Sequence, residues 1–282
     1  MPTLHDPIAF SLGPLEIRWY ALFILCGILG AVALSYWLAA KRGLDPEYIF
    51  DMAPWVVFLG IAGARLYYVA LEWRHFQGDP LAALNIRSGG LSIHGSIIVG
   101  LIVIWGLCRR SRQPFFTWID IIVPGVALGQ AIGRWGNWAN QEAFGTPTTL
   151  PWAVTIDPAR RPAGYEQFAT FHPTFLYESL FNLLNAIVLS WLVLRMPRLG
   201  RLRSGDVAGI YLISYGVIRF VIERIRTDSL YIGPLPAAYW LSFGLVAAGL
   251  LLMVSRRTIF ATANEDAPAP FGGHGQITKG AS

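Results

Sequence analysis

The sequence is poor in charged residues and in cysteine. Asp, Glu, Lys and Arg make up 14% of its 282 residues, against about 25% in an ordinary soluble domain. Hydrophobic residues reach 54% and the mean hydropathy is +0.48, so a soluble globule could not hide its apolar surface beneath so few charges. Cys26 and Cys108 are too few for a disulfide-rich scaffold, and the composition also excludes disordered and collagen-like chains. It indicates a polytopic membrane protein.

Seven apolar stretches approach the length of a membrane-spanning helix, which needs about 20 mostly apolar residues. They cover residues 20–40, 50–73, 91–108, 117–133, 175–194, 207–225 and 237–254. We therefore predict an all-α integral membrane protein whose membrane domain covers residues 1–261. Residues 134–174 are polar and contain prolines, which predicts a small subdomain between the fourth and fifth spans. Residues 262–282 are rich in Pro, Gly and polar residues and are predicted to form a disordered tail.

Basic residues are biased to one side of this membrane domain. The loops after the first, third and fifth spans, together with the C-terminal tail, hold more than half of the 22 Lys and Arg residues. This bias predicts an N-terminus outside, a C-terminus in the cytoplasm and an outer, periplasmic position for residues 134–174. The N-terminal segment lacks the basic region of a cleavable signal peptide, so the first span is expected to remain in the mature protein.

Ionisable side chains inside a membrane segment are costly, so each needs a partner or a function. The densest group lies between residues 129 and 145, where four polar residues have the spacing of one helix face: Gln130, Arg134, Asn137 and Gln141. Four glycines in the same segment allow another chain or a ligand to approach the backbone. Arg134 alone could be an arginine that snorkels from a helix end, but the whole stripe exceeds what snorkelling requires.

Two further groups repeat this helical spacing. One is a carboxylate and two amides that should face inward: Glu178, Asn182 and Asn185. A hydrogen-bonded seam between helices is the structural alternative for this group. The other has two arginines and one glutamate: Arg219, Glu223 and Arg226. Arg219 and Glu223 can pair within a helix, yet the group is expected to leave a net positive charge near the outer face.

Three single features complete the candidates. His94 lies in a glycine-rich segment at the outer mouth of the third span, where a structural and a functional role are equally compatible with the sequence. Arg65 lies inside an apolar run. Trp19 and Tyr20 begin the first span, where a belt of interfacial aromatic residues is the simpler explanation.

The sequence lacks the motifs of most enzyme classes. It has no Cys/His pattern typical of a metal site, no nucleophile elbow and no Walker loop. Both cysteines lie within or at the ends of spans, so neither is an exposed nucleophile. Inward-facing arginines suit an anionic headgroup, because guanidinium binds phosphate through forked hydrogen bonds. The residues alone therefore indicate an intramembrane site for a phosphate-bearing lipid.

The densest segment, Gly133-Arg134-x-Gly136-Asn137-x-x-Asn140-x-Glu142-x-x-Gly145, resembles the signature of the bacterial prolipoprotein diacylglyceryl transferase family. That signature usually has phenylalanine where Trp138 stands. Other segments resemble further motifs of the family: a Gly-rich segment ending in His94-Gly95, His172-Pro173 with Tyr177-Glu178, Tyr215-Gly216-x-x-Arg219 with Glu223 and Arg226, and Trp19-Tyr20. The resemblance runs in order from about residue 15 to residue 255.

This resemblance implies an enzyme of the bacterial cytoplasmic (inner) membrane. Such an enzyme moves the diacylglyceryl group of phosphatidylglycerol to the lipobox cysteine thiol of a preprolipoprotein, forms a thioether and releases glycerol 1-phosphate. The resemblance implies no metal or nucleotide cofactor. The expected partners are phosphatidylglycerol, the signal-peptide and lipobox region of the preprolipoprotein, and membrane lipids, without nucleic acid.

Site residues follow from the resemblance together with the chemistry of the transfer. Arg134 and Arg219 are predicted to clamp the departing phosphate, where negative charge develops. His94 is the expected base for the thiol, with Tyr20 and Glu178 as positioning residues. The substrate-binding set is completed by residues of the signature and of the seventh span: Asn137, Asn140, Glu142, Gly145, Glu223 and Arg226.

Two alternatives remain at this stage. A membrane transporter for an anionic solute could also use buried arginine and glutamate, although the sequence shows no matching halves of an inverted repeat. A lipid-binding structural protein could use the same arginines without turnover. An activity assay distinguishes both alternatives from the transferase.

Overall fold

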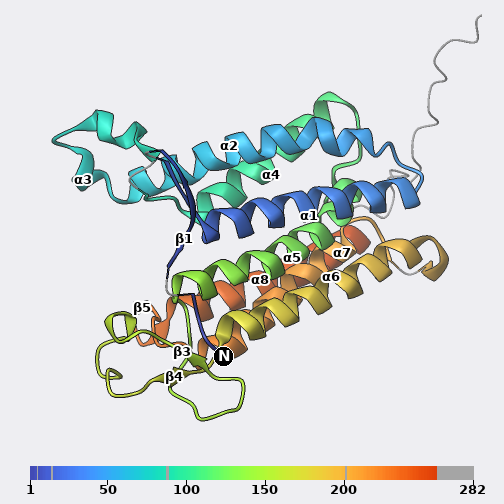
Figure 1. The fold of residues 1–282 in the computed structure, drawn as a ribbon. Coiled ribbons are helices and arrows are strands. Elements are labelled where there is room, and N and C mark those ends of the chain that lie inside the picture. Colours follow the sequence, from blue (N-terminus) through green and yellow to red (C-terminus); the bar gives the residue numbers. More distant parts are fainter. Residues whose placement is uncertain (5, 14, 87–88, 201, 259–282) are drawn as a thin grey trace, which may run out of the picture.

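The computed structural model describes residues 1–4, 6–13, 15–86, 89–200 and 202–258, so the predicted tail of residues 262–282 lies outside the described residues. Within these ranges, long helices run roughly side by side along one axis, as Figure 1 shows. They are α1 (Trp19–Lys41), α2 (Glu47–Leu71), α4 (Ile93–Arg110), α5 (Phe115–Asn140), α6 (Thr174–Leu199), α7 (Asp206–Glu223) and α8 (Ala237–Thr258). Short helical segments lie in the connections: α3 (Trp73–Phe76), η1 (Pro80–Leu84) and η3 (Pro158–Arg160).

Six of the long helices have the length and composition of membrane spans: α1, α2, α4, α5, α6 and α8. Their large apolar side chains face outward; Leu29, Phe58 and Leu251 are 59%, 67% and 69% exposed. Such surfaces are stable in lipid, which solvates them as water cannot. The chain is therefore an all-α, multi-pass integral membrane protein, as the sequence predicts. Because α7 carries Asp206, Arg219 and Glu223, its assignment as a seventh span stays a prediction.

The predicted spans and the observed helices agree within a few residues, except at the end of α5. The fourth apolar stretch ends at Gly133, but the helix continues to Asn140. Its last turns therefore carry Arg134 and Asn137 on a rigid element instead of a loop. Helix α5 ends because Gln141 adopts the left-handed conformation, with φ of 52°, and reverses the chain.

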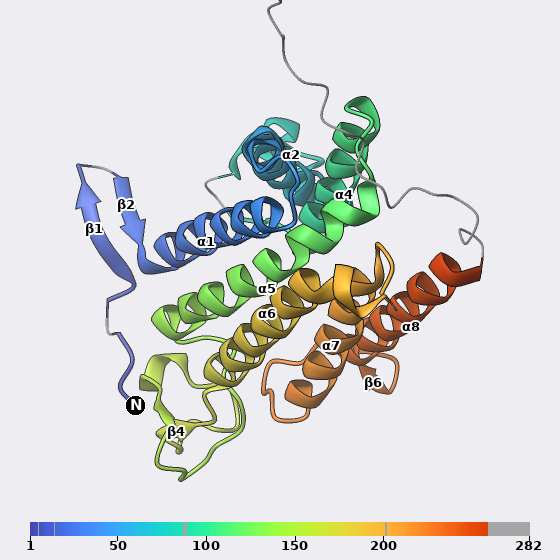
Figure 2. The same ribbon diagram turned by 90° about the vertical axis from the view of Figure 1, so that its right-hand side faces the viewer.

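Helix α5 lies between α1 and α6, with the α2–α4 pair beyond α1 and the α7–α8 pair beyond α6 (Figure 2). Glycines allow the closest of these contacts, as is usual between membrane helices. A Cβ atom added to Gly27 of α1 would lie 2.9 Å from the carbonyl oxygen of Gly129 in α5. One added to Gly95 of α4 would overlap the carbonyl oxygen of Gly63 in α2.

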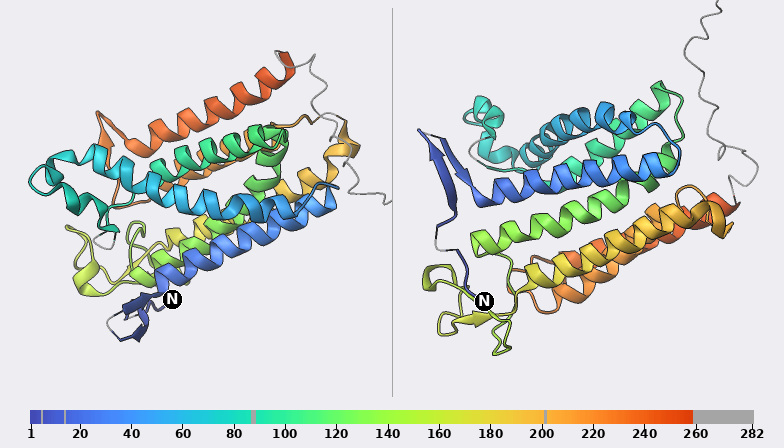
Figure 3. Two further views of the ribbon diagram at one scale, coloured as in Figure 1. Left: turned by 90° about the horizontal axis from the view of Figure 1, so that it is seen from above. Right: turned by 45° about the vertical axis from the view of Figure 1, so that its right-hand side comes forward.

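The two ends of the bundle differ. Three two-stranded antiparallel sheets gather at one end: β1 (Ile8–Leu12) with β2 (Leu15–Arg18), β3 (Val154–Thr155) with β4 (Thr170–Phe171), and β5 (Tyr231–Ile232) with β6 (Leu235–Pro236) (Figure 3). Residues 141–173 build a small core of their own around Phe144, Ile156 and Phe171, which packs on the end of α5. The side of the membrane on which this unit lies stays a prediction.

The largest apolar core lies toward the opposite end. It joins the end of α1 to the start of α5 and the end of α6, through Leu38, Trp118 and Leu189. Asp120 of α5 is buried there, and its carboxylate accepts hydrogen bonds from the backbone N–H groups of Gly205 (2.7 Å) and Ala208 (2.8 Å). These bonds satisfy two N–H groups at the start of α7, so this polar residue anchors a helix end.

Candidate active site

Glu178, near the start of α6, is buried and faces three guanidinium groups. Its carboxylate forms an ion pair with Arg134 Nη2 of α5. Its other oxygen lies 3.8 Å from Arg219 Nη1 of α7 and 3.5 Å from Arg226 Nη1, just beyond α7. Burying one carboxylate without a cation would be strongly unfavourable, and here three cations offset that cost. Glu178 therefore ties α5, α6 and the end of α7 together at one point.

Glu223 and Asp228 hold two of these arginines from the other side. Arg219 Nη2 lies 2.6 Å from Glu223 Oε2. Arg226 binds Asp228 with both arms of its fork, through Nη2 (2.7 Å) and Nε (2.9 Å). Burial lowers the pKa of Arg226, but the hydrogen bond to Asp228 and the nearby carboxylates outweigh it and raise the pKa above its ordinary value. Arg226 is therefore charged and largely occupied by the protein's own acids.

The assembled site is more nearly neutral than its sequence suggests. The third sequence group was expected to leave a net positive charge, because it holds two arginines and one glutamate. In the structure, carboxylates from outside that group join it. The arginine cluster, as we call it, consists of three cations and three anions: Arg134, Arg219, Arg226, Glu178, Glu223 and Asp228. The expected net charge is therefore wrong for the cluster as a whole, although Asp228 is 50% exposed and better solvated than the rest.

Two of the arginines keep hydrogen-bonding capacity for a ligand. Arg219 Nη1 is buried and has no hydrogen-bond partner in the part of the chain that the structure describes. Among the described residues, Arg134 Nη1 makes only a long hydrogen bond, 3.4 Å, to Asn137 Oδ1. A buried donor without a partner is costly, so such a group points to an acceptor that binds there. Because Arg134 and Arg219 contact opposite oxygens of Glu178, a single multi-oxygen anion could reach both.

The carboxylate of Glu142, which follows the reversal of the chain at Gln141, binds the last turn of α5. Glu142 Oε1 accepts a hydrogen bond from Asn137 Nδ2 (2.9 Å) and a longer one from Asn140 Nδ2 (3.5 Å). Gln141 lies between them in sequence but points into the small core, where its amide donates to Leu4 O (2.9 Å) and binds Asp157. Gln141 therefore does not share the polar stripe predicted from helical spacing, because the helix stops at Asn140.

Two glycines allow close contacts at the cluster. Gly145 pairs with Arg226 in an isolated bridge, and a Cβ atom there would lie 2.7 Å from Ile225 O. Gly136 packs beneath Tyr20, whose Cδ2 would lie 2.6 Å from an added Cβ atom. Tyr20 is also close enough to Arg134 and Glu142 to interact with them electrostatically. These contacts explain why glycine occupies both positions.

The predicted amides of α6 do face inward. Asn182 is fully buried and Asn185 is 7% exposed. Asn185 Oδ1 accepts a hydrogen bond from Ser214 Oγ of α7 at 3.0 Å, so part of the predicted helix–helix seam exists. The amide nitrogen and oxygen of Asn182 have no partner among the described residues. A polar band therefore continues from Glu178 into the bundle.

The structure does not bring His94 to the arginine cluster. His94 stands at the start of α4 and is exposed. Its contacts among the described residues are with Ser92, whose Oγ is 3.5 Å from Nδ1, and with Tyr67, whose ring centroid is 6.0 Å away. The reason is the close pairing of α4 with α2, which places His94 on the far side of α1 from α6.

Arg65 proves to be a structural residue. It is 6% exposed, and its guanidinium donates to four backbone carbonyl oxygens of the segment between α2 and α4: those of Ala82, Ala83, Gly89 and Gly90. The rings of Tyr68 and Phe76 lie against it. Arg65 therefore satisfies the carbonyls of an irregular segment and leaves little capacity for a ligand.

Sequence reasoning missed two residues near the site. Asp228 lies two positions beyond Arg226, and this short spacing after a helix end could have indicated the pair. Trp152 donates a hydrogen bond to the hydroxyl of Tyr177 at 2.9 Å, and Tyr177 in turn lies 3.1 Å from His172 Nδ1. Trp152 carries no sequence signal of its own, because it reaches Tyr177 only through the fold of residues 141–173.

Known proteins resemble this chain over most of its length. Residues 7–255 match the family described as prolipoprotein diacylglyceryl transferase. The chain is 47% identical to a phosphatidylglycerol–prolipoprotein diacylglyceryl transferase of Synechococcus elongatus, covering 89% of this chain and 88% of that one. It is 44% identical to the protein of the same name from Gloeobacter violaceus, over 94% and 97% of the two chains. A relative with this name from Finegoldia magna is 39% identical over 88% and 95%. The chain therefore belongs to the prolipoprotein diacylglyceryl transferase family.

Proposed function

We propose that this protein transfers the diacylglyceryl group of phosphatidylglycerol to the lipobox cysteine of a preprolipoprotein. The cysteine loses its thiol proton and attacks the glyceryl carbon that carries the phosphate. A carbon–sulfur bond forms, the carbon–oxygen bond to phosphate breaks, and glycerol 1-phosphate leaves. The names of the relatives and the family match support this reaction, the first step of lipoprotein maturation.

The pair of arginines around Glu178 carries the proposal. The departing phosphate gains negative charge as the carbon–oxygen bond breaks, so donors aimed at it lower the barrier. Arg134 and Arg219 have the spare donors for this task, including the buried Nη1 of Arg219. Glu178 acts as a positioning residue, because its ion pairs hold both guanidinium groups. Arg226 and Glu223 support the arrangement from the end of α7.

Substrate binding is proposed to use the end of α5 as well. Asn137, Asn140 and Glu142 form one hydrogen-bonded unit beside Arg134, and their amides can bind the glycerol hydroxyls of the headgroup. Gly145 lets the following chain approach Arg226. Tyr20, packed on Gly136, would close this unit from the side of α1.

His94 is the proposed base for the cysteine thiol, whose ordinary pKa is about 8.5. Its exposed ring is accessible to a peptide substrate. Since it does not contact the arginine cluster, the bound lipid and peptide must together bridge the space between them. Phosphatidylglycerol and the lipobox region of a preprolipoprotein are therefore proposed to bind at the same time.

The proposed location is the bacterial cytoplasmic membrane, with the N-terminus and the arginine cluster outside and the C-terminus in the cytoplasm. Two features support this orientation. The end of the bundle away from the cluster has more of the basic residues. It also has the short connections, residues 42–46 and 111–114, whereas the long ones lie at the cluster's end.

The test uses purified protein in liposomes with phosphatidylglycerol and a lipobox peptide. A peptide that gains one diacylglyceryl unit, with release of an equal amount of glycerol phosphate, supports the proposal. A peptide with serine in place of its cysteine is the control and should gain nothing. No mass gain with a folded protein would contradict the proposed reaction and leave a lipid binder or a transporter.

A further inference from the structure

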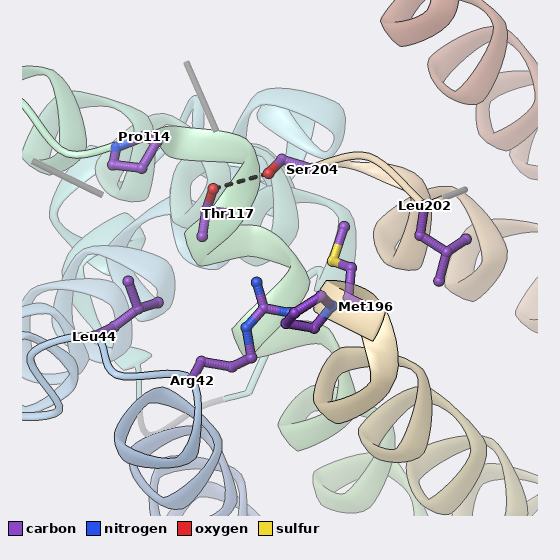
Figure 4. A pocket seen from close by; sticks show the side chains of 8 residues that line it. Arg42, Leu44, Pro114, Thr117, Met196, Leu202 and Ser204 are labelled. Carbon is purple, nitrogen blue, oxygen red and sulfur yellow. Dashed lines mark hydrogen bonds between the residues drawn. The ribbon is translucent and has the colours of Figure 1, made fainter. Parts of the chain in front are cut away.

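A second possible binding site lies at the other end of the bundle. A cavity of about 360 Å³ opens between the end of α1, the start of α5, the end of α6 and the connection to α7. Its polar lining residues are Arg42, Thr117 and Ser204, and its apolar wall includes Leu44, Met196 and Leu202. Figure 4 shows these side chains arranged around one space.

This cavity is separate from the arginine cluster. Thr117 is near the start of α5 and Arg134 is near its end. With a rise of about 1.5 Å per residue, the two positions lie about 25 Å apart along the helix. In a bilayer whose hydrocarbon core is about 30 Å thick, they face opposite leaflets. A ligand in the cavity is therefore not the lipid bound at the cluster.

Arg42 gives the cavity a cation with unused donors. Its Nη1 donates to the carbonyl oxygen of Val193 at 2.7 Å. Within the described ranges, this is the one hydrogen bond of the Arg42 guanidinium. A guanidinium has five N–H donors, so most of them remain for a ligand. Burial lowers the pKa of Arg42 although the charge of Asp120 opposes this effect. A partly buried cation of this kind is stabilised when an anion binds beside it.

The start of α5 adds to this preference for an anion. Pro114 precedes the helix, and no side chain caps its first turn. The N–H groups of that turn give the helix start a partial positive charge. The hydroxyls of Thr117 and Ser204 form a hydrogen bond with each other at 3.0 Å, which leaves one of the two hydroxyl protons for an acceptor. The carboxylate of Asp120 is nearby, but its oxygens already accept the N–H groups of Gly205 and Ala208.

The apolar wall indicates which anion would fit. Leu44, Met196 and Leu202 leave a surface that a small hydrated ion would not cover. Basic pockets between membrane helices at the bilayer surface are typical of anionic phospholipid headgroups, whose phosphate needs cations and whose glycerol and acyl chains need apolar contacts. Lys41, Arg195 and Arg198 end the same helices and would attract such a lipid.

We infer that this cavity binds the phosphate group of an anionic phospholipid from the leaflet opposite the arginine cluster. Arg42, Thr117 and the start of α5 bind the phosphate, and Leu44, Met196 and Leu202 contact the rest of the headgroup region. The lipid would brace the ends of α1, α5 and α6 against one another. This inference does not depend on the transferase reaction.

Native mass spectrometry of the purified protein tests this inference by counting bound lipids. Phosphatidylglycerol is compared with phosphatidylcholine of the same acyl chains and with inorganic phosphate alone. Arg42→Gln is expected to retain one phosphatidylglycerol fewer than the wild type, with at least about a tenfold weaker affinity for that molecule. Arg109→Gln, at the exposed end of α4, is the control and should retain the wild-type number.

Thr117→Val separates loss of the site from loss of the fold, because it removes one hydroxyl at nearly constant volume. It is expected to weaken the same lipid several-fold while peptide transfer at the distant cluster continues. Unchanged lipid numbers in both variants would overturn the inference. Equal binding of phosphatidylcholine, or binding of inorganic phosphate without competition by phosphatidylglycerol, would overturn the assignment to an anionic lipid.

Discussion

At the residue scale, Glu178 is the side chain on which the site depends most. It is the carboxylate that Arg134 contacts, and it also lies within 4 Å of Arg219 and Arg226. If Glu178 is neutralised, Glu223 and Asp228 remain for Arg219 and Arg226, whereas in the described part of the chain Arg134 keeps only its long hydrogen bond to Asn137. One carboxylate therefore sets the position of an arginine that the proposed reaction needs.

Glu178→Gln is expected to lower the stability of the protein by about 3 kcal/mol, because it breaks a buried ion pair and leaves the partly buried Arg134 without its carboxylate. The measurement is the free energy of unfolding in detergent. The control is Glu166→Gln in the exposed connection of residues 141–173, where the amide oxygen can still accept the N–H group of Gly164. Equal stability of the two variants would contradict the structural role given to Glu178.

His94→Asn tests the proposed role of His94 as the base, since His94 lies away from the arginine cluster. If His94 removes the thiol proton, the variant should lose at least about a hundredfold in turnover, with little change in lipid binding. Turnover is measured with saturating peptide. Near wild-type turnover would exclude His94 as the base. The position of His94 away from the arginine cluster would then explain why it takes no part in the reaction.

The residues of the cluster could be predicted, but their electrostatic balance could not. Helical spacing identified Arg134, Glu178, Arg219, Glu223 and Arg226 as inward-facing groups. Spacing within one helix cannot show which groups from different helices meet. It therefore missed Asp228 and overestimated the positive charge, because partners across α5, α6 and α7 are set by tertiary packing.

At the scale of the elements, the contact between α2 and α4 depends on glycine. Gly95→Ala places a methyl group against Gly63 O and the side chain of Tyr67, so the helices must separate. This change is expected to destabilise the protein by about 1–3 kcal/mol. Gly106→Ala in the same helix meets no atom within 4 Å and should be neutral or slightly stabilising.

The midpoint of thermal unfolding in detergent distinguishes these two variants. A shift for Gly95→Ala with none for Gly106→Ala is the expected result. Similar midpoints would mean that α2 and α4 do not approach as closely as described. Gly95→Ala would also move His94, the second residue of α4. The turnover of this variant therefore also reports on the contact between α2 and α4.

Element positions were predicted well where hydropathy alone decides them. The end of α5 was predicted only in part, because hydropathy ended the span at Gly133 although the spacing of Arg134 and Asn137 fits a helix face. In the protein they remain helical, since Arg134 pairs with Glu178 and Gly136 packs against Tyr20. Tertiary partners thus extend the helix beyond its apolar stretch, and Gln141 ends it.

At the scale of the whole molecule, the two ends of the bundle differ in structure. One carries the arginine cluster, three small sheets and the long connections, and the other carries the large apolar core and the Arg42 cavity. The loop lengths and basic residues of the sequence predicted that the two ends differ, but they did not predict the sheets, the apolar core or the cavity. It could not predict the order of helices across the bundle, because all the apolar faces are similar in composition.

Cysteine labelling in intact spheroplasts tests the proposed orientation. Gln167→Cys and Arg110→Cys, each exposed and at opposite ends of the bundle, are introduced into a Cys26→Ala background. An impermeant maleimide is expected to label residue 167 in intact spheroplasts and residue 110 only after permeabilisation. The reverse pattern would place the arginine cluster on the cytoplasmic side and contradict the proposed location of the reaction.

The most direct test of the account compares Arg134→Lys with Arg224→Lys in the peptide-transfer assay. Arg224 is an exposed neighbour of the cluster that stacks on Phe220, so its replacement controls for a general loss of positive charge. Lysine keeps the charge at residue 134 but cannot form the fork that binds Glu178 and phosphate together. We predict at least about a hundredfold loss of transfer for Arg134→Lys and near wild-type transfer for Arg224→Lys. Full activity of Arg134→Lys would contradict the arginine clamp.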